Sequence, residues 1–119
     1  MTERSAPIFK VMTRDLWEAS ARGDVVLPMP VDIQDGFMHF SGRGQLEDTL
    51  RLHFTGQRDL VLLGVDPGKL GMGLTWERSK RRGAAFPHLY APCPKEAVLW
   101  HASIEVAPDG SFVLPTTLR

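Results

Sequence analysis

Two short segments of this sequence repeat one alternation of aromatic, imidazole and hydroxyl side chains. Residues 37–41 read FMHFS and residues 86–90 read FPHLY. In an extended strand successive side chains point to opposite faces, so each segment places its aromatic, histidine and hydroxyl on a single face. The opposite face of the first segment, Met38 and Phe40, is apolar and predicts core. Two such strands side by side would line one cleft with two imidazoles.

Length and composition restrict what surrounds that cleft. With 119 residues, 43% hydrophobic and 24% charged, we expect one globular domain, residues 1–119, with a core over about residues 8–115. Lys plus Arg and Asp plus Glu balance at 14 each, which favours neither nucleic acid nor membrane as a partner. The sequence lacks a signal-like or membrane-length apolar run, so a cytoplasmic location is expected. A single cysteine excludes an internal disulfide.

Two helices are predicted. The first begins after Thr13, a favourable N-cap, and ends at Gly23. In the second, Leu46, Leu50 and Phe54 recur at helical spacing with charged residues on the outer side. Between these helices, residues 24–34 contain two prolines, which we expect to exclude a helix and to favour an extended connection.

Strands dominate the second half of the chain. Residues 59–65 are almost continuously apolar, which is typical of a strand buried on both faces. Residues 97–106 alternate, with Trp100 and Ile104 on the inner face. Further strands are expected at residues 8–12, 37–41, 74–77, 86–90 and 111–114. The pattern predicts an α+β domain with mostly antiparallel sheets and about two helices.

Several segments together resemble a known family. They are IFK at 8–10, DGFMHFS at 35–41 with Gln45 behind it, DLVLL at 59–63, WE at 76–77 and FPHLY at 86–90. In this order and spacing they resemble the bacterial domain-of-unknown-function family number 952, over roughly residues 8 to 100. The resemblance implies an ADP-ribosyltransferase-like fold, in which a split sheet holds NAD in a cleft.

The resemblance also implies roles for residues. In that fold a strand of the His-x-Ser kind borders the nicotinamide end of the cleft, assisted by a first-strand His or Arg and a late glutamate. Here Lys10 occupies the first-strand position, and Glu77 and Glu96 are both candidates for the glutamate. NAD is thus the expected cofactor, with a nucleotide-like small molecule as partner.

The candidate residues fall into two groups. The predicted catalytic residues are His39, Glu77 and His88. The predicted binding residues are Phe37, Ser41, Gln45, Trp76, Phe86 and Tyr90.

Each candidate also has a structural interpretation. His39 can be a strand histidine bonded to a backbone carbonyl, and Ser41 can cap the helix that begins near Gly44. Tyr90 can simply pack at a sheet end, and Glu77 can be a solvated strand residue.

Three other features remain open. Lys80, Arg81 and Arg82 can reach a pyrophosphate, or form an ordinary solvated loop. The four histidines lack the close spacing of metal sites, so no metal is expected. Cys93 has no evident base partner in the sequence.

Three functions follow. The first is an ADP-ribosyltransferase-like enzyme or NAD-type nucleotide binder. The second is a non-catalytic module of the same fold that binds a small metabolite or a partner. The third is a hydrolase that uses His39 or His88 as base, although no convincing nucleophile accompanies it. The oligomeric state is not predicted.

Overall fold

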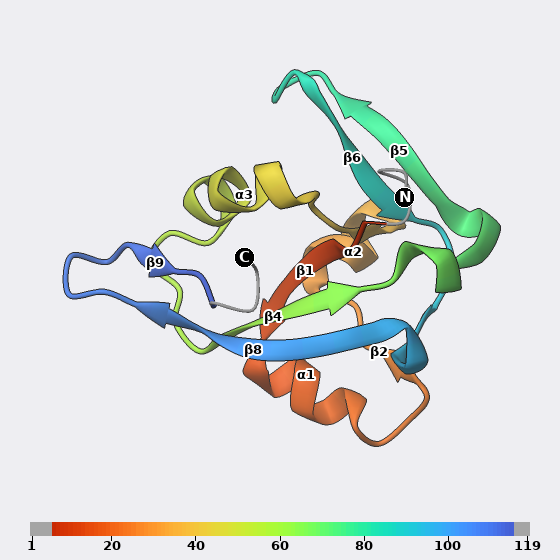
Figure 1. The fold of residues 1–119 in the computed structure, drawn as a ribbon, viewed down its shortest axis with the longest axis horizontal. Helices are drawn as coiled ribbons and strands as arrows, with labels where there is room; N and C mark the ends of the chain where they lie inside the picture. The colour runs from red at the N-terminus through yellow and green to blue at the C-terminus, as the bar shows by residue number, and fades with distance from the viewer. Residues whose placement is uncertain (1–5, 116–119) are drawn as a thin grey trace.

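The computed structural model describes residues 6–115, and its main sheet has four antiparallel strands in the order β1-β4-β8-β9. These are β1 (Ile8–Thr13), β4 (Leu60–Val65), β8 (Val98–Val106) and β9 (Phe112–Val113) (Figure 1). β4 lies between β1 and β8, and all six of its residues are buried, as its apolar run predicts. The hairpin turn before β9 is also where the sequence places it.

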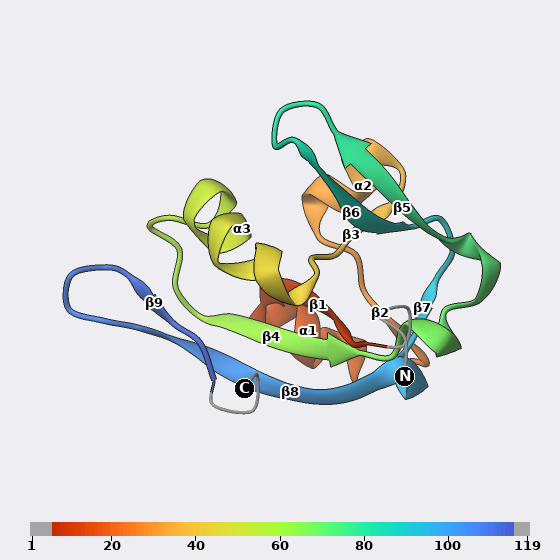
Figure 2. The same cartoon turned by 45° about the horizontal axis from the view of Figure 1, so that its top comes forward.

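Two smaller sheets make the fold a split one. β3 (Met38–His39), β6 (Ala84–Leu89) and β5 (Leu74–Ser79) form the second sheet, and β2 (Val25–Val26) pairs with β7 (Cys93–Pro94). The β5–β6 hairpin rises away from the main sheet (Figure 2). Phe9 and Ser41 tie the two sheets together by exchanging two backbone hydrogen bonds of 2.8 Å each. The prediction of an α+β domain with mostly antiparallel sheets is confirmed.

Helices α1 (Arg14–Ser20) and α3 (Leu46–His53) cover opposite faces of the main sheet. α1 begins as predicted, because the Thr13 hydroxyl accepts a hydrogen bond from the backbone N–H of Leu16. Leu46 and Leu50 of α3 pack on the Phe9 side of β1. Burying both faces of the sheet in this way fixes β1 between two apolar clusters and leaves only its edge open.

A third helix, α2 (Pro30–Asp35), corrects the expectation of an extended connection over residues 24–34. Pro30 is the first helical residue, where its missing N–H costs no hydrogen bond and its fixed φ suits the helix. Asp32 reaches back to accept from the backbone N–H of Met29 at 2.7 Å, which satisfies a free donor at the helix start. Gly36 ends the helix in the left-handed conformation, φ 84°.

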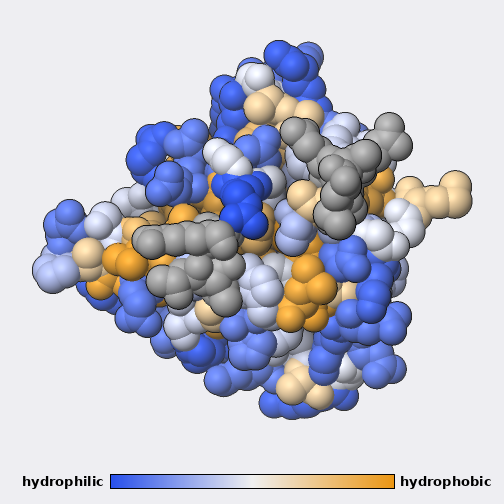
Figure 3. Space-filling model, viewed as in Figure 1, coloured by the Kyte–Doolittle hydropathy of each residue, from blue (hydrophilic) through white to orange (hydrophobic). Residues whose placement is uncertain are grey.

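The remaining described elements are short 3₁₀ turns: η2 (Arg43–Gln45), η3 (Pro67–Lys69), η4 (Gly71–Gly73) and η5 (Lys95–Ala97). Hydrophilic side chains cover most of the face seen in Figure 3, with small hydrophobic areas over β8 and near β9. Within residues 6–115 the longest apolar helical stretch falls well short of what a membrane crossing requires.

Candidate functional site

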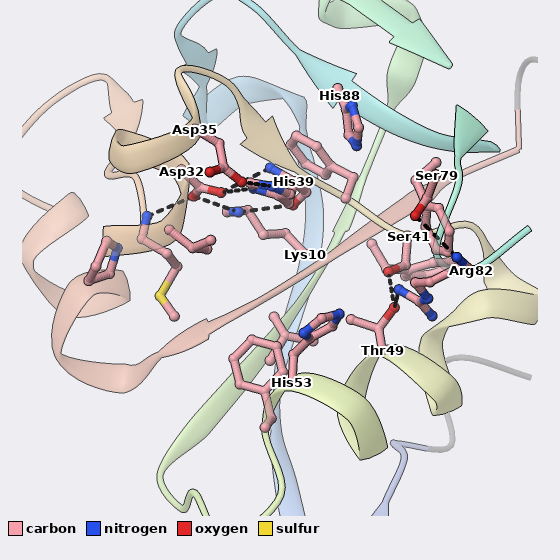
Figure 4. A pocket seen from close by; sticks show the side chains of 18 of the residues that line it. Lys10, Asp32, Asp35, His39, Ser41, Thr49, His53, Ser79, Arg82 and His88 are labelled. Atoms are coloured by element: carbon pink, nitrogen blue, oxygen red, sulfur yellow. Dashed lines mark hydrogen bonds and ion pairs between the residues drawn. The ribbon is translucent and has the colours of Figure 1, made fainter. Parts of the chain in front are cut away.

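A cleft of about 700 Å³ opens where the two sheets separate. α2 and α3 form two of its walls, the edge of β1 forms its floor, and β3 with the β5–β6 hairpin closes the remaining side (Figure 4). Its volume lies within the range of roughly 300–1,000 Å³ that is usual for small-molecule sites. Four predicted site residues line this cleft: His39, Ser41, Phe86 and His88.

The two histidine segments converge, as the alternation predicts. β3 and β6 are antiparallel neighbours, and their register sets His39 directly opposite His88, with ring centroids 5.5 Å apart. The Phe37 ring lies against both, with its centroid 4.6 Å from His39 and 4.2 Å from His88. It also contacts Tyr90, at 5.1 Å. One aromatic ring therefore holds two imidazoles and a phenol in fixed orientations.

Both ring nitrogens of His39 already face carboxylates. Its Nδ1 lies 2.8 Å from Oδ1 of Asp32, and its Nε2 lies 2.9 Å from Oδ2 of Asp35. A carboxylate only accepts, so both contacts are hydrogen bonds when the ring carries two protons. In this arrangement His39 has no lone pair free to take a proton from a ligand.

Asp32 also forms a buried ion pair with Lys10. The Lys10 ammonium lies 2.8 Å from Oδ2 of Asp32, and both side chains are at most 2% exposed. Lys10 donates in addition to the backbone carbonyl of His39, at 2.9 Å. Burial lowers the pKa of Lys10, although the charge of Asp32 opposes this. Lys10 therefore neutralises Asp32 and braces the strand that carries His39.

The Asp32 carboxyl is strongly acidic in this setting. Burial by itself would raise its pKa, but the hydrogen bond from His39 and the charge of Lys10 outweigh burial and lower it to about 2. Asp32 also accepts the backbone N–H groups of Met29 and His39. Four donors thus converge on one carboxylate.

His88 keeps one nitrogen available. Its Nδ1 lies 2.8 Å from Oε1 of Glu77, and the Tyr90 hydroxyl donates to the same oxygen at 2.6 Å. Within residues 6–115, His88 Nε2 has no hydrogen-bond partner. The hydrogen bonds from Tyr90 and His88 lower the pKa of Glu77, and the bond to Glu77 raises the pKa of Tyr90. A carboxylate that orients an imidazole in this way is the arrangement of a general base.

The edge of β1 contributes main-chain groups to the cleft floor. Phe9 directs its N–H and C=O away from β4 toward Ser41, and backbone direction alternates along a strand. Val11, two residues on, therefore directs its own N–H and C=O to the same open side, and it lines the cleft. Beyond Ser41 the described chain offers this edge no further pairing strand. An amide on a ligand can use both groups.

The remaining predicted binding residues have other roles. The Ser41 hydroxyl bonds Thr49 at 2.8 Å, so it does not cap the helix. Gln45 ties the start of α3 to β6, accepting from Gly42 and donating to the Ala85 carbonyl at 2.6 Å. Trp76 is half exposed on the opposite face of β5 from Glu77, outside the cleft lining. The structure thus brings Glu77 and Tyr90 to His88 but leaves Gln45 and Trp76 apart.

The three cationic residues of the basic loop also differ in their position relative to the cleft. Of these only Arg82 lines the cleft, while Lys80 and Arg81 are exposed. Cys93 is buried, and burial raises the pKa of its thiol to about 11, which disfavours the reactive thiolate. Among the described side chains there is no group of three His, Cys, Asp or Glu placed to hold a metal ion.

Sequence reasoning missed the acidic partners of His39. Asp32 and Asp35 belong to α2, the helix that the prolines were expected to exclude. The signal was present in Pro30-x-Asp32: proline at the first helical position followed by an acid at the third marks a helix start. Lys10 was expected only to occupy the first-strand position where the resemblance has a His or Arg, and its partner Asp32 could be found only from the fold.

Comparisons with known proteins give the same outline. The protein CC0527 from Caulobacter crescentus, a structural-genomics target, matches in its crystal structure with 38% identity, a TM-score of 0.86, and coverage of 94% of this chain and 97% of that chain. Its solution NMR structure matches with 40% identity, a TM-score of 0.75, and coverage of 88% and 90%. A search of curated proteins found no match.

The family model described as "Protein of unknown function (DUF952)" matches residues 11–101. That span includes both histidine segments, α2, α3 and the β5–β6 hairpin. It therefore covers nearly every element that forms the cleft. This chain belongs to the DUF952 family.

Proposed function

We propose that the cleft binds NAD or a related nucleotide, on a fold like that of the ADP-ribosyltransferases. The observation that carries the proposal is the pair of imidazoles, both in contact with Phe37, that line one end of a cleft of about 700 Å³. A flat ring can pack beside the His88 imidazole, which lines the cleft and is itself held by Phe37 outside that lining. The carboxamide of a nicotinamide offers N–H donors and a carbonyl acceptor, which match the open C=O and N–H of Val11.

In this proposal His88 is the proton-transfer residue. Glu77 holds Nδ1–H of His88, which leaves the Nε2 lone pair to accept a proton from water or an acceptor hydroxyl. Glu77, an anion, also stabilises positive charge that develops on a ribose as its bond to nicotinamide breaks. His39, held by two carboxylates, positions the wall of the cleft rather than moving a proton.

Thermal unfolding with NAD, ADP-ribose and mononucleotides tests the binding. A ligand at a hundredfold excess over its dissociation constant stabilises the folded state by about 2.7 kcal/mol. We expect NAD or ADP-ribose to raise the unfolding temperature of the wild type, and His88→Ala to abolish the increase. His101→Ala is the matched control, because His101 contacts Trp17 outside the cleft lining and its loss should leave the increase intact. If no dinucleotide stabilises the wild type, the proposal fails.

A second candidate is a non-catalytic module that binds a small polar metabolite in the same cleft. Both His39 nitrogens and Lys10 are bonded to carboxylates, which favours this candidate. Groups that are already paired hold the cleft in shape and are not available to take part in a reaction. Release of nicotinamide from NAD separates the two candidates. Binding without release, in the presence of water and acceptor amines or hydroxyls, supports the module.

A further inference from the structure

Arg82 lines the cleft and forms no ion pair with any carboxylate of the described residues. The ion pairs among residues 6–115 satisfy Arg14 with Asp59 and Arg51 with Asp48, but none includes Arg82. Its guanidinium donates to the Thr49 hydroxyl at 3.0 Å. A guanidinium has five N–H donors, so most of them remain available to a ligand.

The position of Arg82 is set before any ligand arrives. Its guanidinium carbon lies 4.1 Å from the centroid of the Phe86 ring, a close cation–π contact. Its backbone N–H donates to the Ser79 hydroxyl, which fixes the turn between β5 and β6. Because stacking and Thr49 hold the side chain, little conformational entropy is lost when an anion binds.

A second ionisable group lies on α3, the helix that carries Thr49. His53, in the last turn of α3, lines the cleft, and Arg82 reaches toward this helix from the turn between β5 and β6 (Figure 4). Burial lowers the pKa of His53, and the positive charges of Arg82 and His39 lower it further. An anion placed between His53 and Arg82 would offset this repulsion and favour the protonated imidazole.

At the opposite end of the cleft the cationic side chain is already paired. Lys10 lies 2.8 Å from Asp32, and both carboxylates, Asp32 and Asp35, are bonded to His39. A ligand with one anionic end is therefore better accommodated with the anion toward Arg82. Arginine matches phosphate oxygens through parallel N–H donors. An imidazole that takes up a proton when the anion binds adds a second positive charge, which favours a dianionic phosphate over a carboxylate.

We propose that Arg82, His53 and the Thr49 hydroxyl form a phosphate subsite at the α3 end of the cleft. The subsite rests on the proposed function, since it places the phosphates of a nucleotide there and the base or nicotinamide beside His39 and His88. It also assigns the phosphate contact to one residue of the basic loop, because Lys80 and Arg81 are exposed and do not line the cleft.

Pyrophosphate binding to the full chain, followed by NMR and calorimetry, tests the subsite. A lost charge-assisted contact costs roughly 1.5–3 kcal/mol, so Arg82→Gln should weaken pyrophosphate binding about tenfold or more. Arg81→Gln removes an equal charge from the same loop and should change binding less than about twofold. In the wild type pyrophosphate should raise the pKa of His53, and in Arg82→Gln this rise should disappear.

Three results would overturn the subsite. Equal losses in the two variants would mean that only the general charge of the loop acts. Acetate binding as tightly as pyrophosphate would mean a carboxylate site. If the NMR signal of His53 does not change when pyrophosphate binds, His53 is not part of the subsite. Should Arg82→Gln fail to fold, Arg82→Lys keeps the charge but loses the paired donors, and it should still weaken binding.

The subsite and the nucleotide proposal fail in different ways. Pyrophosphate binding that depends on Arg82, with no stabilisation by NAD or ADP-ribose, supports the subsite and rejects the nucleotide. Stabilisation by NAD that is unchanged in Arg82→Gln supports the nucleotide and rejects the subsite.

Discussion

His39 and His88 come from the same local pattern, yet their surroundings give them different chemistry. Each follows an aromatic residue by two positions, and their rings contact each other and Phe37. His39 is bonded through both nitrogens to Asp32 and Asp35. His88 is bonded through one nitrogen to Glu77, with the other facing no partner among the described residues.

The difference arises from the element that packs beside each strand. α2 lies next to β3 and delivers two carboxylates to His39. β5 lies next to β6 and delivers one carboxylate to His88. A histidine with a single orienting carboxylate has a second nitrogen available for proton exchange, whereas one held by two carboxylates serves as a structural link between them. The same sequence motif therefore produces a structural histidine, His39, and a candidate general base, His88.

The largest effect on the free energy of unfolding should come from removing the Asp32 carboxylate, which holds both His39 and Lys10. Asp32→Asn leaves Lys10 buried beside a neutral side chain, and removing one partner of a buried pair costs about 3–5 kcal/mol. Asp35→Asn removes the other, exposed carboxylate of His39 and should cost about 1 kcal/mol or less. Urea denaturation measures both free energies of unfolding. Equal losses in the free energy of unfolding would show that the buried ion pair of Asp32 with Lys10 contributes no more than the exposed contact of Asp35.

Acid should reveal the same carboxylate. Because its pKa in the folded protein is about 2, below the ordinary 3.8, Asp32 stabilises the fold above about pH 4 and loses this contribution as the pH falls toward 2. The contribution is about 2 kcal/mol. The free energy of unfolding should decline over this range in the wild type and decline less steeply in Asp32→Asn. Parallel profiles for the two proteins would argue against the lowered pKa.

Chemical modification compares the two imidazoles directly. Diethyl pyrocarbonate attacks an unprotonated ring nitrogen, so His88 should react about tenfold faster than His39, whose nitrogens are both held by charged groups. Mass spectrometry of the peptides gives the two rates. Asp35→Asn removes the carboxylate at Nε2 of His39 and should reduce the difference between the modification rates of His88 and His39. Equal rates in the wild type would contradict the distinction.

The smallest effect concerns the partner of the available histidine. Tyr90 is the single tyrosine of the chain, so ultraviolet absorbance follows its titration without interference from another tyrosine. Glu77→Gln should bring its raised pKa back toward 10, because the negative acceptor is gone. His88→Gln keeps the bond between Tyr90 and Glu77 and should leave the pKa raised. An unchanged titration in Glu77→Gln would mean that the contact does not form in solution.

Local pattern was sufficient for much of the fold. Alternation placed Met38 and Phe40 in the core and His39 and His88 on one shared face, because side-chain direction in a strand depends only on residue parity. The apolar run 59–65 likewise gave a central strand. The prediction of an extended connection over residues 24–34 was wrong for α2. Proline ends a helix when it lies in the interior, but it favours a helix when it occupies the first helical position.

The sequence by itself determined which residues share a face of each strand, and the tertiary structure decided which of them line the cleft and what each can do there. His39, Phe86 and His88 followed from parity within their own segments and line the cleft, whereas Phe37 packs against the two imidazoles outside its lining. Their protonation and hydrogen bonds depend on Asp32, Asp35, Glu77 and Lys10, which lie on other elements and meet them only after the sheets and α2 have packed. Charge interactions act through space, so a one-dimensional pattern specifies a histidine's direction but not its partner.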